Sequence, residues 1–523
     1  MRTVLAVVVI VLTTDLSTAL AIARRPDLRA QNVDAPTTAP LALPFVGRGV
    51  DLASLPVPPT APPTATPSAT SSASATSSAT ATPTATSTNA PTAAPTAAPT
   101  PAVAVDGPRV TTAHYDLHVE AGVGLDGADI GRLLESAYPQ LAAFFGGEPP
   151  VVGPTGRLPG KIFGTSAAMA AAMAADGITY GGGGGYYHPT NRTFYAFAQP
   201  SAFFTRMLIL HEATHQFHYL SATGNHGYSG FWFGEGLAEH FGMHNWDGTR
   251  LAMGIVPAIS LEDYPAQALA EFDAKGHDLA ALVADRAGWT RPSGWGVVSW
   301  LIDERPEGAK ALFDRLNRRE DLAASWTAVF GPVADADAAA YRAWLTRHQQ
   351  PWREVWRAFE QRGDALIGAS GVNAIAVRKW VADAQPDTDD DDPASAPLAV
   401  SLEPLAGPLR AGIIVGYTDA AHFVVVQLLA SRDIWAFRMS PAGWQWLAGA
   451  RAPDADPGRA AGRDVLEARP ADGGGWTVAV NGADVITVPD EGLVGLNVDG
   501  CTVAFLGVDA GALPTLGDAA ARR

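Results

Sequence analysis

The chain has 523 residues, 47% hydrophobic and 17% charged, which is enough apolar content for more than one buried core. Its formal net charge of −17 argues against nucleic acid or an anionic membrane surface as a partner. The single cysteine, Cys501, excludes an internal disulfide, so each domain must be held by its own core.

The N-terminus has the pattern of a secretory signal. Arg2 precedes the apolar run Val4–Leu12, and Ala19-Leu20-Ala21 fits a small-residue cleavage site. The run is too short to span a bilayer. We predict a signal peptide over residues 1–23 and a secreted or cell-envelope protein with no stable transmembrane segment after processing. An uncleaved anchor is the alternative.

A low-complexity segment follows, rich in Pro, Thr, Ala and Ser, with near repeats such as Ala93-Ala94-Pro95-Thr96. Because it has almost no large apolar side chains, it cannot form a core. We predict a disordered, extended linker over residues 24–108 that acts as a stalk.

The first ordered domain is expected to mix strands and helices from about residue 109. Alternation over Tyr115–Val119 predicts a strand, and Ile130–Phe145 predicts an amphipathic helix. The glycine run Gly181–Gly185 leads into Tyr186–His188, a turn, and Thr193–Phe197, which together predict a β-hairpin. A plain glycine-rich loop is the alternative.

The next stretch carries the residues of a metal site. Ser201 is a candidate N-cap for an apolar helix that contains His211-Glu212-Ala213-Thr214-His215. Four residues are about one turn, so His211 and His215 share a face and can bind one Zn²⁺. Glu212 can reach a water beside the metal without being a ligand. The alternative is a helix with two surface histidines.

A second predicted helix, beginning near Phe231, supplies the missing ligand. A catalytic zinc takes three protein ligands and keeps one open position. Glu235 and Glu239 stand one turn apart on a single face. Glu235 can complete a His-His-Glu site, and Glu239 can accept the free N–H of a zinc histidine.

These two helices resemble the gluzincins, the thermolysin-like zinc peptidases. The resemblance rests on His211-Glu212-x-x-His215 and on the distance along the chain to Glu235. The phrase Trp232-x-x-Glu235-Gly236-Leu237-Ala238-Glu239 resembles more narrowly the peptidase MA-like domains of bacterial envelope and secreted proteins. The likeness covers roughly residues 111–348.

The resemblance implies an α+β zincin-like fold with one zinc per chain. His211, His215 and Glu235 would bind the zinc, Glu212 would be the general base, and Glu239 would orient His211. Related domains often carry a tyrosine near what is here residues 291–295, and this sequence has none there.

The resemblance also indicates where a peptide would bind. In such domains an extended substrate pairs with an edge strand beside the zinc, and Gly185, Tyr186 and Tyr187 are the candidates here. His226 and Tyr228 lie between the two metal helices and could reach the reacting carbonyl oxygen. A surface role is the alternative for both.

After the two metal helices, we predict several helices over residues 261–359. One of them would carry an apolar face made of Trp352, Val355, Trp356 and Phe359. We place the peptidase domain at residues 109–375. The acidic run Asp387–Asp392 predicts a solvated linker over residues 376–397, because adjacent carboxylates lack the spacing of a calcium loop.

The last part, residues 398–515, reads as short strands joined by turns, which predicts a β-sandwich. Asn481-Gly482 between two apolar runs is a strong hairpin signal. Gly412–Tyr417, Val480-Asn481-Gly482 and Gly492–Leu496 resemble laminin G-like, concanavalin-type jelly rolls, which often bind glycans or proteins. Trp444 and Trp446 could stack on a sugar, with core packing as the alternative.

The sequence therefore predicts a multidomain protein: a disordered N-terminal stalk, an α+β zincin-like metallopeptidase domain and an all-β jelly-roll sandwich. We expect a secreted zinc metallopeptidase that hydrolyses peptide or protein substrates, with Glu212 as general base. The alternative is a catalytically weak surface binding or adhesion protein with a structural metal and a sandwich that binds a glycan or protein.

Overall fold

The structure is a computed structural model. It describes residues 104–150, 155–260, 263–286, 288–356, 359–379, 397–453 and 463–508. The expected signal peptide, nearly all of the expected N-terminal linker and the acidic run Asp387–Asp392 lie outside the described residues. Within the described ranges, no helix combines the length and the apolar character needed to cross a membrane.

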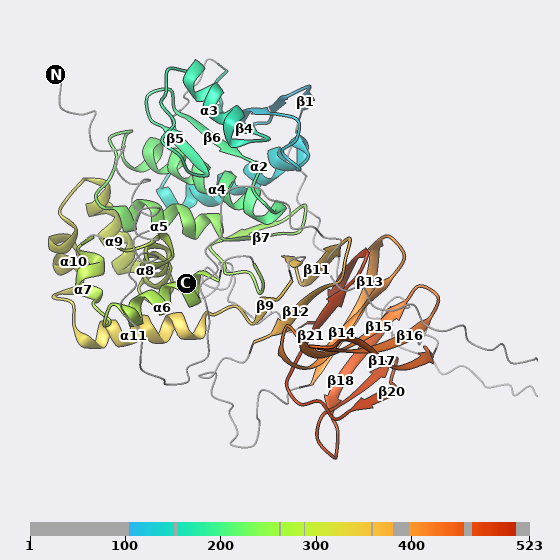
Figure 1. Cartoon of the computed structure of the whole chain (residues 1–523). Coiled ribbons are helices and arrows are strands. Elements are labelled where there is room, and N and C mark those ends of the chain that lie inside the picture. Colours follow the sequence, from blue (N-terminus) through green and yellow to red (C-terminus); the bar gives the residue numbers. More distant parts are fainter. Residues whose placement is uncertain are drawn as a thin grey trace, which may run out of the picture.

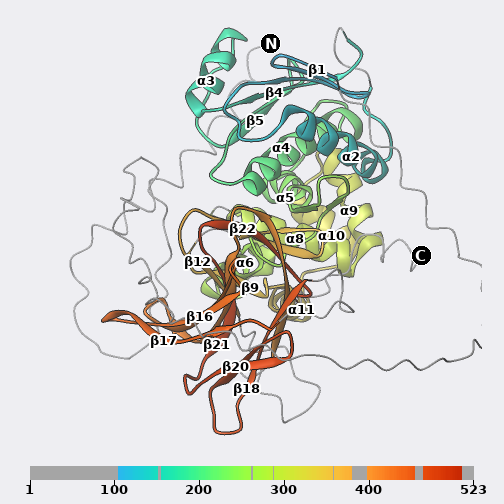
Figure 2. The ribbon, with the colours of Figure 1, turned by 90° about the vertical axis from the view of Figure 1, so that its right-hand side faces the viewer.

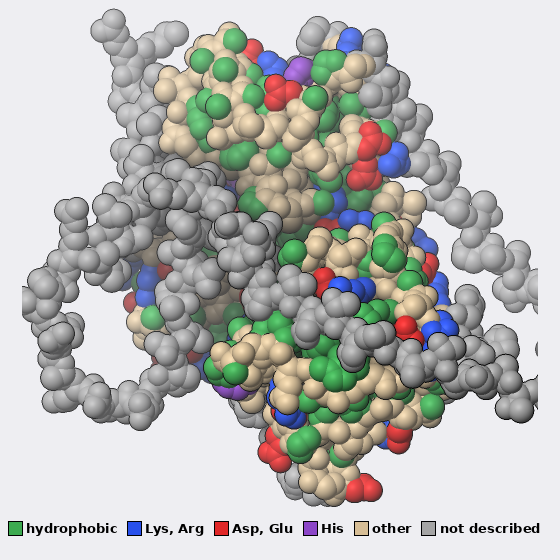
Figure 3. All heavy atoms as spheres, turned by 45° about the vertical axis from the view of Figure 1, so that its right-hand side comes forward, with side chains coloured by type: hydrophobic (Ala, Val, Ile, Leu, Met, Phe, Trp, Pro, Cys, Tyr) green, Lys and Arg blue, Asp and Glu red, His purple; other side chains and the backbone are tan. Residues whose placement is uncertain are grey.

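Two parts of different architecture make up the described chain. A six-stranded sheet with helices forms one end of the molecule and an all-β sandwich forms the other (Figures 1 and 2). On the face drawn in Figure 3, acidic and basic side chains are interspersed among hydrophobic ones over both parts.

The six-stranded sheet has the order β1-β2-β3-β4-β6-β5. Its strands are β1 (Ala104–Asp106), β2 (Arg109–Thr111), β3 (Tyr115–Val119), β4 (Leu158–Phe163), β5 (Gly185–His188) and β6 (Thr193–Phe197). Strands β3, β4 and β6 are parallel, and β5 runs antiparallel to β6 at the edge, so the predicted hairpin is confirmed. Helices α2 (Gly127–Phe145) and α4 (Ala202–Phe217) pack on one face, and α3 (Ser166–Ala175) packs on the other.

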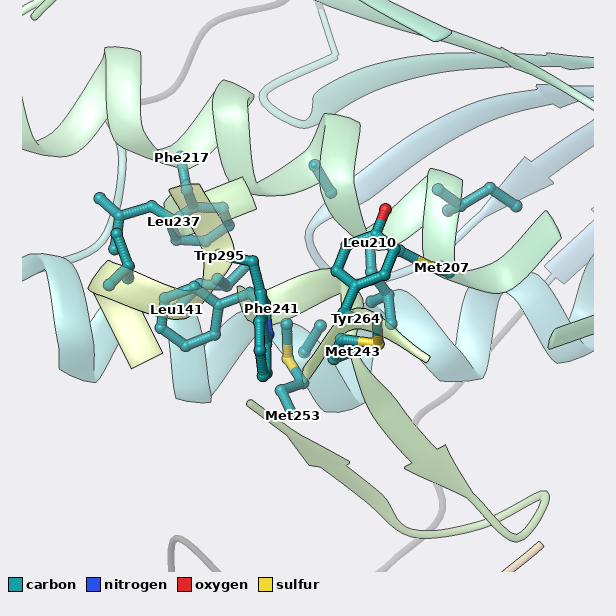
Figure 4. Close-up of a cluster of buried hydrophobic side chains, with 14 of the residues drawn as sticks. Leu141, Met207, Leu210, Phe217, Leu237, Phe241, Met243, Met253, Tyr264 and Trp295 are labelled. Carbon is teal, nitrogen blue, oxygen red and sulfur yellow. The ribbon is translucent and has the colours of Figure 1, made fainter. Parts of the chain in front are cut away.

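The chain then forms a helical layer below this sheet. Helix α4 continues as a π-helical turn, η2 (His218–Ala222). The following elements are α5 (Phe231–Gly242), β7 (His244–Trp246), β8 (Leu251–Met253), α6 (Tyr264–Ala274), α7 (Leu279–Val283), α8 (Arg291–Glu304), α9 (Pro306–Asn317), α10 (Leu322–Phe330) and α11 (Asp335–Arg347). Leu141, Leu210, Leu237 and Trp295, from four different helices, meet in the core drawn in Figure 4.

The C-terminal part is a sandwich of two antiparallel seven-stranded sheets. Their orders are β10-β11-β22-β13-β18-β19-β20 and β17-β16-β15-β14-β21-β12-β9. The strands are β9 (Trp352–Glu354), β10 (Phe359–Arg362), β11 (Ala365–Ser370), β12 (Ala374–Arg378), β13 (Leu398–Ala406), β14 (Arg410–Asp419), β15 (His422–Leu429), β16 (Asp433–Ser440), β17 (Gly443–Arg451), β18 (Asp464–Pro470), β19 (Trp476–Val480), β20 (Ala483–Val488), β21 (Leu493–Val498) and β22 (Cys501–Leu506).

Two predictions for this part are confirmed: it is an all-β sandwich, and Asn481-Gly482 is the turn between β19 and β20. Both turn residues have positive φ, 52° and 83°, as the tight hairpin turn requires.

The expected helix over Trp352–Phe359 is wrong, because this segment forms β9 and the start of β10. The aromatic spacing fits one helix face, but Trp352 packs in the sandwich core, Val355 packs against the cluster on the other face of the sheet, and Trp356 contacts both clusters. Strands β11 and β12 pair with β22 and β21, more than a hundred residues later. The sandwich therefore begins at β9, earlier than the expected start at residue 398.

The two parts are joined by specific contacts at the β10–β11 hairpin. The side chain of Asn245, on β7, donates to the carbonyl oxygen of Gly363 at 2.6 Å and accepts from its N–H at 2.7 Å. Arg206 on α4 pairs with Glu360 at 3.3 Å, and its side chain is only 5% exposed. Ala258 and Ile259 also pack in the sandwich core. The sandwich is thus anchored to the same helix that carries the two histidines.

Candidate metal centre

Helix α4 presents its two histidines from a buried position. Ser201 caps the helix by accepting a hydrogen bond from the Phe204 N–H at 3.1 Å, as expected. Apolar side chains such as Leu210 and Phe217 fix the helix in the core. His211 and His215 are consequently almost inaccessible to solvent.

The structure brings the expected ligand atoms together. The Nε2 atoms of His211 and His215 lie 3.1 Å apart. Glu235, from α5, places Oε2 at 3.5 Å from His211 Nε2 and Oε1 at 3.6 Å from His215 Nε2. One ligand atom from each of the three residues lies within 4.8 Å of the others. Glu212 Oε1 is 4.0 Å from His211 Nε2, beside the group and outside it.

The charge in this cluster fits a divalent cation. Three carboxylates, Glu212, Glu235 and Glu239, stand against one guanidinium, that of Arg291, which leaves two negative charges when all are ionised. The buried Oε2 of Glu212 has no hydrogen-bond partner among the described residues, whereas Oε2 of Glu235 forms an ion pair with Arg291 at 3.3 Å. Two imidazoles and a carboxylate are donors that suit Zn²⁺.

The two histidines have opposite pKa shifts. Against the effect of burial, Glu239 and Glu235 raise the pKa of His211 to about 10, whereas burial, only partly opposed by Glu235, lowers the pKa of His215 to about 3. Burial, opposed by His211, raises the pKa of Glu212 to about 7. Burial would also raise the pKa of Glu235, but Arg291 and His215 outweigh it and lower that pKa.

Each histidine ring is held from its other nitrogen. Glu239 Oε1 lies 3.4 Å from His211 Nδ1, and the Tyr264 hydroxyl donates to Glu239 Oε2 at 3.1 Å. The Tyr228 hydroxyl lies 3.4 Å from His215 Nδ1. These contacts set which nitrogen of each ring faces the ligand group.

Tyr228 and His226 were expected at the reacting carbonyl, and the structure places them differently. Tyr228 reaches the Nδ1 side of His215, whereas the ligand atoms meet on the Nε2 side, and its ring stacks on His218 at 4.5 Å. Among the described residues, no hydrogen bond or ion pair joins the His226 side chain to this cluster. From this position the Tyr228 hydroxyl can orient the His215 ring.

The positions on both sides of Glu235 require glycine because other residues pack closely against them. A Cβ on Gly234 would lie 1.8 Å from a ring carbon of Tyr228, so only glycine admits that ring. A Cβ on Gly236 would lie 2.4 Å from the carbonyl oxygen of Gly294, so only glycine allows α8 to approach α5 this closely. The Gly-Glu-Gly sequence therefore brings Glu235, Tyr228 and α8 together.

Strand β5 lies directly against the general-base candidate. A Cβ on Gly185 would lie 2.6 Å from Glu212 Oε1. Burial and the nearby Glu212 raise the pKa of Tyr186. The hydroxyl of Tyr187 instead donates to Asn225 Oδ1 at 3.4 Å and so supports the loop after η2. The expected edge strand is thus present beside Glu212, at the end of the sheet.

Sequence reasoning missed two members of the cluster, Tyr264 and Arg291. Arg291 Nη2 is 3.3 Å from Glu235 Oε2, and Nη1 is 3.1 Å from Glu239 Oε1. Arg291 begins the stretch of residues 291–295 in which the sequence resemblance led us to look for a tyrosine. Neither residue belongs to a local sequence pattern. The one signal in the sequence was that three clustered carboxylates require a positive charge nearby.

Comparison with known proteins gives similar solved structures only. No family model and no curated protein matches it. Among solved structures it is similar to a carbohydrate-binding module from Bacillus subtilis, with 17% identity, a TM-score of 0.23, and coverage of 30% of this chain and 93% of that one. It is also similar to a family 16 endo-glucanase from Bacteroides ovatus, with 8% identity, a TM-score of 0.19, and coverage of 32% and 86%. Likenesses this weak assign neither a ligand nor an activity.

Proposed function

We propose that the chain is a zinc-dependent peptide hydrolase of the gluzincin type, similar to the peptidase MA-like domains, and that it acts outside the cell. The observation that carries the proposal is the convergence of His211, His215 and Glu235, whose ligand atoms lie within 4.8 Å of one another. Glu212 stands beside them with a buried oxygen that has no partner among the described residues. The N-terminal signal pattern supports the location.

His211, His215 and Glu235 would hold one Zn²⁺ per chain. When bound, the metal supplies a Lewis acid that polarises the scissile carbonyl and makes water more acidic. Glu212 takes a proton from the attacking water and delivers it to the leaving amine. Its pKa of about 7 suits both transfers near neutral pH.

The substrate would lie along β5. An extended peptide can add to the edge of a sheet through main-chain hydrogen bonds, and β5 is such an edge strand. The absence of a side chain on Gly185 lets β5 lie close against Glu212, because a Cβ there would lie 2.6 Å from Glu212 Oε1. Glu239 and Tyr228 meanwhile keep the two imidazoles in orientation. Peptide backbone, metal ligands and general base are therefore adjacent.

A second candidate function is a surface binding or adhesion protein with little turnover. The resemblance of residues 398–508 to laminin G-like jelly rolls, which often bind glycans or proteins, and the sandwich fold of this part support this alternative. Trp444 and Trp446, on β17, are partly buried and pack against Phe437. A glycan would then be the ligand of the sandwich and the metal would be structural.

Glu212→Gln separates the two functions. The amide fills nearly the same volume and leaves the ligands in place, but it cannot accept the proton, and loss of a general base costs about 10²–10⁴ in rate. We expect chelator-sensitive hydrolysis of a broad peptide library by the wild type, and a Glu212→Gln protein with normal zinc content whose rate falls at least about a hundredfold. Glu307→Gln, on the exposed surface of α9, is the matched control and should keep full activity.

A different outcome of the same experiment would contradict the peptidase proposal. If the wild type and Glu212→Gln are both inert on the library and both bind the same glycan array, the adhesion alternative replaces the peptidase.

A further inference from the structure

The first residue of α8 is fixed in place by a neighbouring helix. The Thr290 N–H and hydroxyl donate to Glu271 Oε2, on α6, at 3.2 and 2.6 Å, and the Ser293 hydroxyl donates to the same oxygen. Through these three hydrogen bonds, Glu271 ties the N-terminal end of α8 to α6. The backbone of Arg291 lies inside this tethered turn and cannot move freely.

The approach of α8 to α5 brings Arg291 to the metal centre. The helices touch through glycine on both sides: a Cβ on Gly236 would lie 2.4 Å from the Gly294 carbonyl oxygen, and a Cβ on Gly294 would lie 3.1 Å from the Trp232 carbonyl oxygen. Larger side chains at this crossing would separate the helices and carry Arg291 away from α5.

The guanidinium of Arg291 bridges two carboxylates that have different roles, those of Glu235 and Glu239. One nitrogen lies 3.3 Å from the ligand candidate Glu235, and the other lies 3.1 Å from Glu239. That same Glu239 oxygen is 3.4 Å from His211 Nδ1. Glu239 is 2% exposed, whereas the Arg291 side chain is 40% exposed, so Arg291 closes the cluster from its solvent side.

Two carboxylates this close repel one another unless a cation lies between them. The planar fork of arginine can satisfy both at once, whereas the ammonium of lysine is a point charge on a flexible stem. Without a bridge, Glu235 would be free to turn away from the histidines, and Glu239 would lose a partner that holds it toward His211.

We propose that Arg291 is a positioning residue of the metal centre, and that its guanidinium holds Glu235 toward the histidines and Glu239 toward His211. This inference rests on the proposed metal site, although it does not require that the protein hydrolyse peptides. Arg291 sets how tightly and in what geometry the ion is held.

The test uses the full chain and measures zinc affinity by competition with a chromophoric chelator. Loss of a residue that supports metal ligands typically costs about 10–100-fold in affinity. We expect a loss of that size for Arg291→Gln and a smaller one for Arg291→Lys. Arg305→Gln is the matched control, since Arg305 follows the same helix and pairs with Asp337 at 2.6 Å, away from the metal centre. It should bind zinc as the wild type does.

The visible spectrum of the Co²⁺-loaded protein is the second readout. A merely structural role for Arg291 would lower the melting temperature and leave the spectrum unchanged, whereas a turned Glu235 changes the Co²⁺ spectrum. Wild-type zinc affinity and an unaltered spectrum in both Arg291 variants would overturn the inference, and if Arg291→Gln does not fold, Arg291→Lys decides alone. A wild type that binds no zinc overturns the metal site and this inference together. A wild type that binds zinc without hydrolysing peptides overturns only the peptidase.

Discussion

Gly236→Ala tests whether the α5–α8 contact positions the metal centre. The added Cβ would lie 2.4 Å from a backbone oxygen of Gly294 and 2.8 Å from Val298 Cγ2. Ordinary contact begins near 3.4 Å, so α8 must move by 3.4 − 2.4 = 1.0 Å or the helix must bend. A backbone oxygen cannot rotate out of the way as a side chain can. Arg291, at the start of the same helix, moves with it.

Two opposing effects determine the change in the free energy of unfolding. Alanine in a helix interior is favoured over glycine by about 1 kcal/mol. Overpacking of a tight core costs about 1–3 kcal/mol, and contact with backbone belongs at the upper end. The net loss is therefore about 1–2 kcal/mol. For a part of this size the melting temperature changes by about 2–4 °C per kcal/mol, so we expect a decrease of about 2–8 °C.

The assay is thermal unfolding followed by circular dichroism, with zinc affinity measured on the same samples. Gly308→Ala on α9 is the matched control, because its Cβ would meet the far edge of the Phe330 ring, a partly exposed side chain that can shift. It should lose less stability and no zinc affinity. If Gly236→Ala melts above the wild type, helix propensity alone governs this position, and the argument from close helix packing is refuted.

Two further predictions concern the metal and the boundary between the two parts. Protein purified without chelator should contain about one zinc per chain by elemental analysis, and His215→Ala should lose most of it; full retention by that variant would contradict the ligand set drawn from α4 and α5. A C-terminal fragment that begins at Gln350 should give the dispersed NMR spectrum of a folded sandwich, whereas one that begins at Leu398 should aggregate, since it lacks β9–β12.

Local patterns in the sequence located the residues of the candidate site that share one helix turn. His211 and His215 stand one turn apart, as do Glu235 and Glu239, and helical periodicity alone puts each pair on one face. The Asn481-Gly482 hairpin was equally visible, because a tight turn requires residues that adopt positive φ.

Contacts between distant segments were not visible. Arg291 and Tyr264 reach Glu239 from two other helices, and neither belongs to a periodic pattern. Strands β9–β12 were missed because their partners, β21 and β22, come more than a hundred residues later. Tyr228 was seen as a loop tyrosine, but its orientation depends on the space left by Gly234. Tertiary packing decides such positions, and a single sequence does not display it.

Because the sandwich begins at β9, the place at which the chain can be cut between its two parts lies before this strand. Cutting the chain near residue 384 would leave β11 and β12 attached to the helices without β22 and β21, and would open the edges of both sheets to aggregation. A cut between Arg347 and Gln350 separates the parts without breaking a sheet, but it removes Glu360 from buried Arg206 on α4. The fragment ending at Arg347 loses this ion pair and the packing of Ala258 and Ile259 in the sandwich core, so we expect it to unfold more readily than the same part in the full chain. If the fragment instead melts like the full chain, the sandwich is an independent module and the Arg206–Glu360 contact contributes nothing to the metal helix.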